Sequence, residues 1–179
     1  MRNIFLLSVV SAVLMWSCGG AEKKSNFTAR ENIIVQQDDG SFMLKLDKAD
    51  CYSSVDDPSA NTAEWNVKIT KPGRYNVWLS SATLDTLDLN YSNSVRITLA
   101  DSQLEADPAI DRIVRNSDEV NYPYYRADSF MGSFYFPEPG EYNIQLISEK
   151  VISRELREKT NQLPDNTMLM SVILTPLTR

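Results

Sequence analysis

The chain has 179 residues, of which 42% are hydrophobic, and a formal net charge of −6; this length suits one domain with a packed core. The negative charge argues against nucleic acid or an acidic polysaccharide as an electrostatically recruited partner and favours neutral ligands. Because the sequence contains no histidine, Ser-His-Asp triads, Cys-His pairs and zinc sites with histidine ligands are excluded.

The N-terminus carries the features of a bacterial secretion signal. A basic start precedes an apolar run over residues 4–14, which is too short to cross a bilayer, since crossing takes about 20 apolar residues. The small residue directly before Cys18 resembles the lipobox of bacterial lipoproteins, although Met15 and Trp16 stand where that family prefers leucine and a small residue. We therefore predict a lipoprotein signal peptide over residues 1–17, with an ordinary signal peptide and an incidental cysteine as the alternative.

The lipobox resemblance implies that Cys18 is acylated and anchors the protein in the cell envelope. The next residue, Gly19, is not the aspartate that resembles an inner-membrane retention signal, so we expect an outer-membrane lipoprotein that faces either side of that membrane. If Cys18 carries lipid, Cys51 has no partner for an intramolecular disulfide and is expected to be a small buried hydrophobic residue. The polar, non-periodic residues that follow predict a flexible tether over residues 18–40.

From residue 41 onward, hydrophobic residues alternate with polar ones in short segments separated by turn residues. This period of two is typical of β-strands that bury one face. The alternating segments are residues 42–46, 65–70, 75–80, 95–99, 134–136 and 142–146. Residues 168–174 are almost continuously apolar, which predicts a central strand or one that is covered on both faces. We therefore predict one all-β domain over residues 41–179, built as an antiparallel β-sandwich of two sheets.

One phrase occurs twice within this domain, as TKPGRYNV at residues 70–77 and as PEPGEYNI at residues 137–144. Proline fixes φ at the second position of a tight turn, and the glycine after it can take the positive φ of a type II turn. Tyr75 and Tyr142 then become the first inward residues of the outgoing strands, with hydroxyls that reach solvent or backbone. The pattern leaves open whether each turn closes a hairpin within one sheet or an arch between two sheets.

Two insertions interrupt the strands, and both predict short helices in loops. Ile110, Ile113 and Val114 share helical spacing within residues 105–120. In residues 149–166, Ser153 is placed to cap a helix over residues 155–159, although an extension of the preceding strand fits the same residues. The charges of this second insertion indicate either a solvated face or a loop that docks a protein partner.

The domain resembles the galactose-binding-like β-sandwiches, which have a jelly-roll fold, and more narrowly the carbohydrate-binding modules that are appended to bacterial glycoside hydrolases. The segments that carry the resemblance are WNVKI with PGRYNV, GSFYFP with PGEYNI, and the aliphatic last strand that ends in Thr175-Pro176. The family commonly holds a structural calcium ion with a carboxylate from its last strand. Residues 169–172 contain no carboxylate, so no metal site of that kind is expected.

The resemblance also implies a glycan site. The family often places a ligand-stacking aromatic residue in the loop before the strand that contains Phe134, and Tyr124 and Tyr125 occupy that place. Asn121, Arg126 and Asp128 would then be their hydrogen-bonding partners. Sugars stack on aromatic rings while amides and carboxylates bind their hydroxyls. The alternative is that these tyrosines pack as a lid over the edge of the sandwich.

Trp78 is a further candidate ligand-binding residue. It has the opposite parity to Tyr75, Val77 and Leu79, so its side chain faces away from the core. A covering segment is expected there, because exposed tryptophan is uncommon.

The acidic residues of the loops could in principle form the carboxylate pair of a glycosidase, but none has a distinguishing context. We therefore predict no catalytic residues and no cofactor. The most favoured function is that of a non-catalytic, cell-envelope lipoprotein that binds a neutral glycan through loop aromatics. The alternative is a structural or protein-interaction lipoprotein that docks an envelope partner and binds no sugar. Exposed rings at Tyr124 and Tyr125 would favour the first, and rings buried against Phe134 or Phe136 the second.

Overall fold

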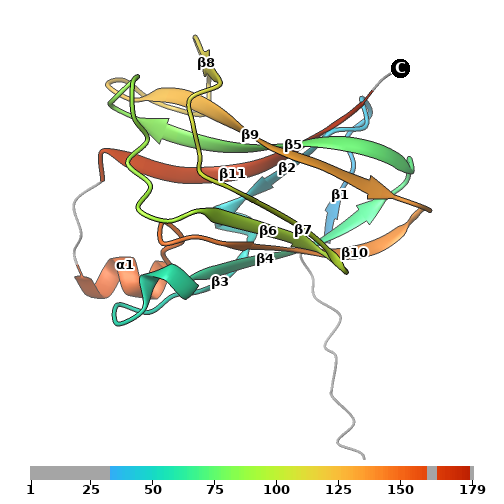
Figure 1. The fold of residues 1–179 in the computed structure, drawn as a ribbon, viewed down its shortest axis with the longest axis horizontal. Coiled ribbons are helices and arrows are strands. Elements are labelled where there is room, and N and C mark those ends of the chain that lie inside the picture. The colour runs from blue at the N-terminus through green and yellow to red at the C-terminus, as the bar shows by residue number, and fades with distance from the viewer. Residues whose placement is uncertain (1–32, 161–164, 178–179) are drawn as a thin grey trace, which may run out of the picture.

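The protein is a sandwich of two β-sheets, as a computed structural model shows for residues 33–160 and 165–177 (Figure 1). The predicted all-β fold with two sheets is confirmed. The predicted signal peptide and the lipidation site Cys18 lie outside the described residues. Within the described residues no helix is long and apolar enough to cross a membrane.

Sheet A contains six strands. In spatial order they are β1 (Ile33–Val35), β4 (Thr62–Ile69), β10 (Gly140–Ile147), β6 (Val95–Leu99) and β7 (Ser102–Ala106), with β3 (Asp50–Tyr52) also paired to β4. Every pairing is antiparallel except that of β1 with β4, which is parallel. Strand β1 lies inside residues 18–40, for which the sequence predicted a tether. Three residues are too few for a period of two to be recognised.

Sheet B has five strands and is antiparallel throughout. Their order is β2 (Phe42–Lys45), β11 (Thr167–Pro176), β5 (Gly73–Thr83), β9 (Tyr125–Phe136) and β8 (Arg112–Val114). The continuously apolar segment forms β11 between β2 and β5, so the prediction of a central strand is confirmed. Short helical segments lie in loops, at η1 (Leu46–Lys48), η2 (Pro58–Ala60) and α1 (Arg154–Thr160).

The core lies between the sheets and follows from the alternation in sequence. Along β4 the buried residues are Ala63, Trp65, Val67 and Ile69, while the residues between them are partly or fully exposed. The indole of Trp65 is buried and donates its Nε1 proton to the Lys45 carbonyl at 2.8 Å, which ties sheet A to sheet B. A buried indole N–H needs an acceptor, and this bond supplies one from the opposite sheet.

Both Pro-Gly turns are arches between the sheets, which settles the question that the sequence left open. One joins β4 of sheet A to β5 of sheet B, and the other joins β9 of sheet B to β10 of sheet A. The hydroxyl of Tyr75 donates to the Lys71 carbonyl, and that of Tyr142 donates to the Glu138 carbonyl at 2.8 Å. In both copies of the repeated phrase, the tyrosine hydroxyl therefore binds the backbone carbonyl four residues earlier and closes the arch. Only the first turn glycine, Gly73, has a positive φ, of 144°.

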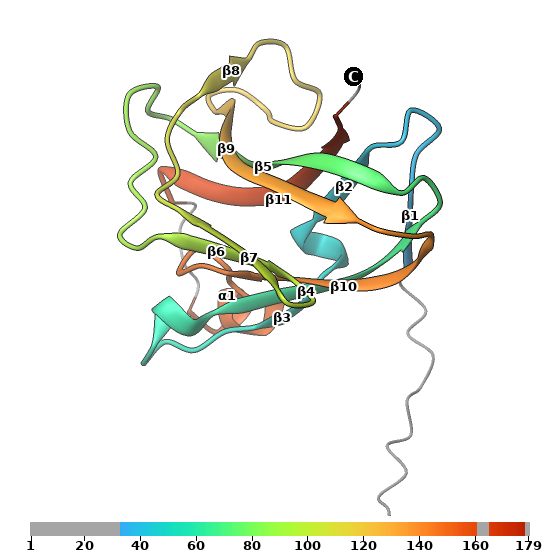
Figure 2. The same ribbon diagram turned by 45° about the vertical axis from the view of Figure 1, so that its right-hand side comes forward.

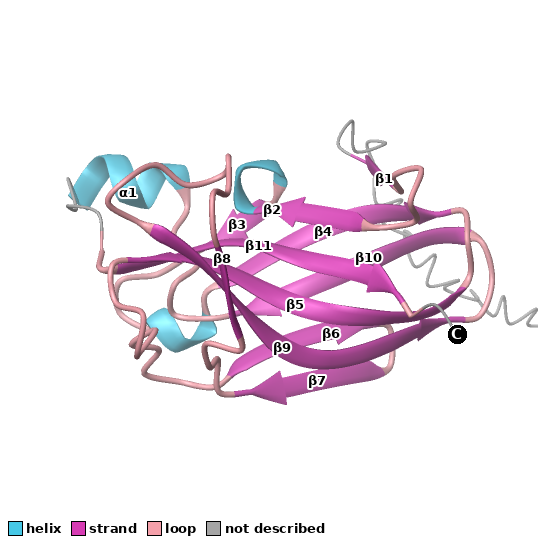
Figure 3. Ribbon diagram, turned by 90° about the horizontal axis from the view of Figure 1, so that it is seen from above, coloured by secondary structure: helices cyan, strands magenta, loops and turns pink. Residues whose placement is uncertain are grey.

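The structure confirms one predicted loop helix and contradicts the other. Helix α1 forms where the sequence placed it, and the Ser153 hydroxyl accepts a hydrogen bond from the Leu156 amide at 3.2 Å, as an N-cap does. Residues 110–115 are not helical: Ile113 belongs to β8 and pairs with Ala127 of β9. The unpaired edge of β9 offers backbone hydrogen bonds that a single helical turn does not match. Helix α1 and the arches lie at opposite ends of the sandwich (Figure 3).

Candidate functional site

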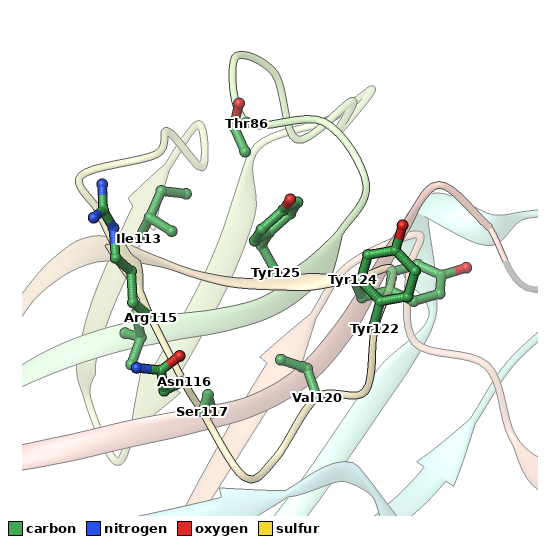
Figure 4. A pocket seen from close by; sticks show the side chains of 10 residues that line it. Thr86, Ile113, Arg115, Asn116, Ser117, Val120, Tyr122, Tyr124 and Tyr125 are labelled. Carbon is green, nitrogen blue, oxygen red and sulfur yellow. The ribbon is translucent and has the colours of Figure 1, made fainter.

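The candidate site is an open pocket at the end of sheet B away from the arches, with a volume of about 690 Å³. Its walls come from the loop after β5, from β8, from the loop between β8 and β9, and from the first residue of β9. Figure 4 shows the lining residues, which are Thr86, Ile113, Val114, Arg115, Asn116, Ser117, Val120, Tyr122, Tyr124 and Tyr125. The pocket thus combines three aromatic rings and three aliphatic side chains with a hydroxyl, amide and guanidinium rim.

The loop between β8 and β9 gives the pocket its shape. Asn116 has a φ of 55°, a left-handed conformation that asparagine tolerates better than most residues. Further along, the Tyr124 amide donates to the Asn121 carbonyl at 3.0 Å, closing a turn around the cis peptide bond between Tyr122 and Pro123. Between them, the left-handed residue and the turn carry the chain across the end of sheet B and into β9.

The three tyrosines differ in exposure. Tyr122 is 93% exposed and Tyr125 is 46% exposed, whereas Tyr124 is partly buried and its hydroxyl donates to the Asp165 carbonyl at 3.2 Å. None of them reaches Phe134 or Phe136, which lie at the other end of β9 and pair with the start of β5. Of the two tyrosines named from the sequence, Tyr125 is exposed as a ligand-binding ring would be, whereas Tyr124 is partly buried.

Sequence reasoning found part of this site and missed the rest. Tyr124 and Tyr125, which the sequence suggested as ligand-binding residues, both line the pocket. Tyr122 stands in the same cluster but was not predicted. Pro123 could have indicated it, because a residue before proline is restricted to extended conformations that are typical of loops. Arg115 was missed because residues 110–115 were assigned to a surface helix, and Asn116 and Ser117 follow directly in the same insertion. Thr86 comes from a distant loop, and no local signal could have found it.

Arg126 and Asp128 lie on the same strand as Tyr125 but do not line the pocket. The carboxylate of Asp128 is fully buried; it accepts hydrogen bonds from Arg126 Nε at 3.0 Å and from Arg112 Nε at 2.8 Å. Arg126 also donates through Nη1 to Glu119 at 2.6 Å, and Glu119 pairs with Lys45 at 3.6 Å. This group, called the ion network below, ties β2, β8 and β9 to the pocket loop.

The ion network shifts the titration of its central acid. Burial alone would raise the pKa of the Asp128 carboxyl, but hydrogen bonds from Arg126 and Arg112 outweigh it and hold the pKa below the ordinary 3.8. Asp128 is therefore a structural anion whose charge is satisfied internally. Asn121, the remaining predicted partner, is exposed next to the pocket and is not among the residues that line it.

Trp78 faces away from the core and is covered, as predicted. Arg112 stacks over its ring at 4.5 Å from the centroid, and Phe130 lies beside it with ring centroids 5.1 Å apart. The indole is partly buried between these neighbours and does not line the pocket. Cation–π stacking of this kind stabilises the outer face of sheet B, and the guanidinium occupies a place over the ring where a sugar would otherwise stack.

The acids of the pocket loop belong to a different hollow. Asp118 and Glu119 line a smaller pocket of about 380 Å³ together with Lys45 and Asp47. In the part of the chain that the structure describes, no three cysteine or acidic side chains converge as ligands for a metal ion would.

Comparison with known proteins identifies the fold. No family model and no curated protein matches the sequence. Among solved structures the chain is similar to an α-L-fucosidase from Vibrio sp. strain EJY3, with a TM-score of 0.63 and 23% identity over 81% of this chain and 24% of the fucosidase. It also aligns with a GH26-CBM35 β-(1,4)-mannanase from Podospora anserina (TM-score 0.47, 11% identity, 79% of this chain and 28% of that one).

A third alignment is with the insecticidal crystal protein Cry2Aa, at a TM-score of 0.46 and 13% identity over 79% of this chain and 22% of that one. The chain spans about a quarter of the length of each of these proteins. The likeness to part of the α-L-fucosidase shows the sandwich fold, a class that carries many unrelated functions.

Proposed function

We propose that this protein is a non-catalytic carbohydrate-binding protein that recognises a glycan through the tyrosines of its open pocket. The observation that carries the proposal is the exposure of Tyr122 and Tyr125 at the rim of a pocket with hydroxyl and amide groups around it. Pyranose rings stack their apolar faces on such rings, and polar side chains then orient the hydroxyls. The similarity in fold to part of an α-L-fucosidase supports an association with carbohydrate.

A catalytic role is not proposed, because the chemistry of the pocket does not favour one. Glycosidases need two carboxyl groups on either side of the bond that they cleave. None of the described residues that line the pocket is an aspartate or a glutamate. The nearest acids of the loop, Asp118 and Glu119, line the other hollow.

The binding proposal is tested by retardation of the protein in native gels cast with a panel of polysaccharides, with and without a chelator. We expect at least one polysaccharide to retard the protein and Tyr125→Ala to abolish the retardation. Tyr125→Ala should leave the melting temperature unchanged, because the ring is half exposed and lies outside the core. Retardation that survives in Tyr125→Ala would place the sugar elsewhere.

The location in the envelope is a second part of the proposal. We propose that acylated Cys18 anchors the protein in the outer membrane. The first described strand, β1, belongs to sheet A (Figure 2), whereas the residues that line the pocket adjoin sheet B. Cys18→Ala should move the protein from the membrane fraction to the soluble fraction, and an unchanged membrane pool would disprove the anchor.

A protein-docking role is the second candidate function, favoured by one observation. Leu87 is 91% exposed and Leu84 is 41% exposed in the loop that also contributes Thr86 to the pocket wall. Large apolar side chains at a loop tip are common at protein interfaces. Under this reading, Leu87→Asp would abolish capture of an envelope protein and leave glycan retardation intact.

A further inference from the structure

Arg115 differs from the arginines of the ion network. Arg112 and Arg126 both bind the buried carboxylate of Asp128, and Arg126 also binds Glu119. Arg115, by contrast, is exposed, lines the pocket, and has no ion pair or hydrogen bond with any residue that the structure describes. Its guanidinium therefore keeps its full hydrogen-bonding capacity for a ligand.

The charge of the pocket is opposite in sign to that of the chain. The whole sequence has a net charge of −6, but the described residues that line the pocket include one arginine and no acid. Asp118 and Glu119, which follow Arg115 closely in sequence, line the smaller pocket instead. Because salt screens charges beyond about 8–10 Å, the net charge of the whole chain does not by itself set the charge of this pocket.

An amide and a guanidinium lie on the same side of the pocket. Figure 4 shows Arg115 and Asn116 on one side of the pocket, Tyr122 and Tyr124 on the other, and Tyr125 between them. A sugar ring on Tyr125 would therefore have an amide and a guanidinium on one flank. Guanidinium binds carboxylate through two parallel hydrogen bonds, and its planar fork fits this group better than a lysine ammonium does.

We infer that the glycan recognised by this pocket carries carboxylates, so that a uronic acid residue stacks on Tyr125 while its carboxylate meets Arg115. The inference rests on the proposed glycan-binding function and narrows its ligand class. It also reverses the expectation of a neutral ligand, which came from the net charge of the whole chain. That net charge describes the average surface and not the rim on which a ligand lies.

The test compares polymers that differ only in charge. The probes are polygalacturonate and alginate, each used as it is and after chemical reduction of its carboxyl groups to hydroxymethyl groups. Affinity is measured by gel retardation at about 150 mM salt, where weak long-range attraction is screened. We expect reduction of the carboxyls to weaken retardation by about tenfold or more, which is the size of one charge-assisted hydrogen bond. Arg115→Gln should bind the two forms of each polymer equally.

Arg74→Gln is the matched control. Arg74 is also an exposed arginine, and it is the second residue of β5 at the arch end of the same sheet, where its Nη1 donates to the Ser133 hydroxyl at 3.2 Å. The Arg74→Gln variant loses the same charge as Arg115→Gln, but at the arch end and not in the pocket, so it should keep the preference for the uronate forms. A preference that Arg74→Gln loses as strongly as Arg115→Gln would mean that net charge, and not the pocket, selects the polymer.

The outcomes separate this inference from the proposed function. Equal retardation by the uronate and reduced forms, lost in Tyr125→Ala, would overturn the acidic ligand and keep the glycan site. A preference for uronates that survives in Arg115→Gln would overturn the role of this arginine. No retardation by any of the four polymers would overturn the acidic ligand, and only the absence of retardation by every polysaccharide of the wider panel would also overturn the glycan-binding function.

Discussion

Replacing Asp128 with asparagine tests whether the ion network holds the pocket loop on the sandwich. The substitution keeps the shape of the side chain but removes the charge, and it presents amide protons to guanidinium groups that can only donate. Removing one partner from a buried ion pair typically costs about 3–5 kcal/mol. Arg112 is about half exposed and can turn to solvent, and Arg126 keeps Glu119, so we expect a loss of about 2–3 kcal/mol.

The assay is urea and thermal unfolding of the purified protein and its Asp128→Asn variant. For a domain of this size the loss corresponds to a melting temperature lower by roughly 5–10 °C. Because the folded state holds the pKa of Asp128 below 3.8, the carboxylate stabilises the fold above about pH 4, and this contribution disappears as the pH falls through the folded-state pKa. The difference in stability between wild type and variant should therefore shrink below pH 4.

Asp118→Asn is the control for this experiment. Asp118 is an exposed acid of the same loop, so its substitution should change the free energy of unfolding by less than about 0.5 kcal/mol. An Asp128→Asn variant as stable at pH 7 as this control would refute the reasoning. A stability difference that does not depend on pH between 3 and 7 would show that the charge of Asp128 contributes nothing.

Three further substitutions test the fold. Tyr75→Phe removes the hydroxyl that donates to the Lys71 carbonyl inside the first arch, and should cost about 1–2 kcal/mol in urea unfolding; an unchanged midpoint would show that the arch does not need it. Gly132→Ala should cost about 1–3 kcal/mol, because φ is 126° and the new Cβ would lie 2.9 Å from Leu104 Cδ2; a neutral result would mean that this side chain yields freely. Ser153→Ala should speed hydrogen exchange in α1 by roughly fivefold, the equivalent of about 1 kcal/mol for a lost N-cap, and unaltered exchange would rule out the cap.

The strands were predictable because each repeats a local pattern. Trp65, Val67 and Ile69 alternate with polar residues, and alternation alone decides which face of a strand is buried. The connections between sheets were not predictable, since Pro72-Gly73 and Pro139-Gly140 fit hairpins and arches equally well. The choice between them depends on where β10 and β5 find partners far along the chain.

The helix predicted at residues 110–115 is wrong for the same reason, because a strand elsewhere in the chain decides the structure there. Ile113 and Val114 do satisfy helical spacing, but they are also β-branched residues next to an open strand edge. Pairing of Ile113 with Ala127 supplies that edge with hydrogen bonds. The spacing of hydrophobic residues in 110–115 cannot reveal this open edge. Strand β9 begins eleven residues after the last residue of β8, and its position is set by its pairing with β5.

The stretch NYPYYRAD was predicted as one cluster of ligand-binding residues, and the structure divides it by function. Tyr125 begins β9 and lines the pocket, whereas Arg126 and Asp128, one and three positions later, project toward the ion network. Successive side chains of a strand point to opposite faces, so odd and even positions of this stretch were bound to separate once it became a strand. Loss of binding in an Arg126 variant would therefore not identify a ligand contact, since Arg126 holds Glu119 and with it the pocket loop. Substitutions at Tyr125 and Arg115, whose side chains line the pocket and take no part in this network, are the ones that report on the ligand itself.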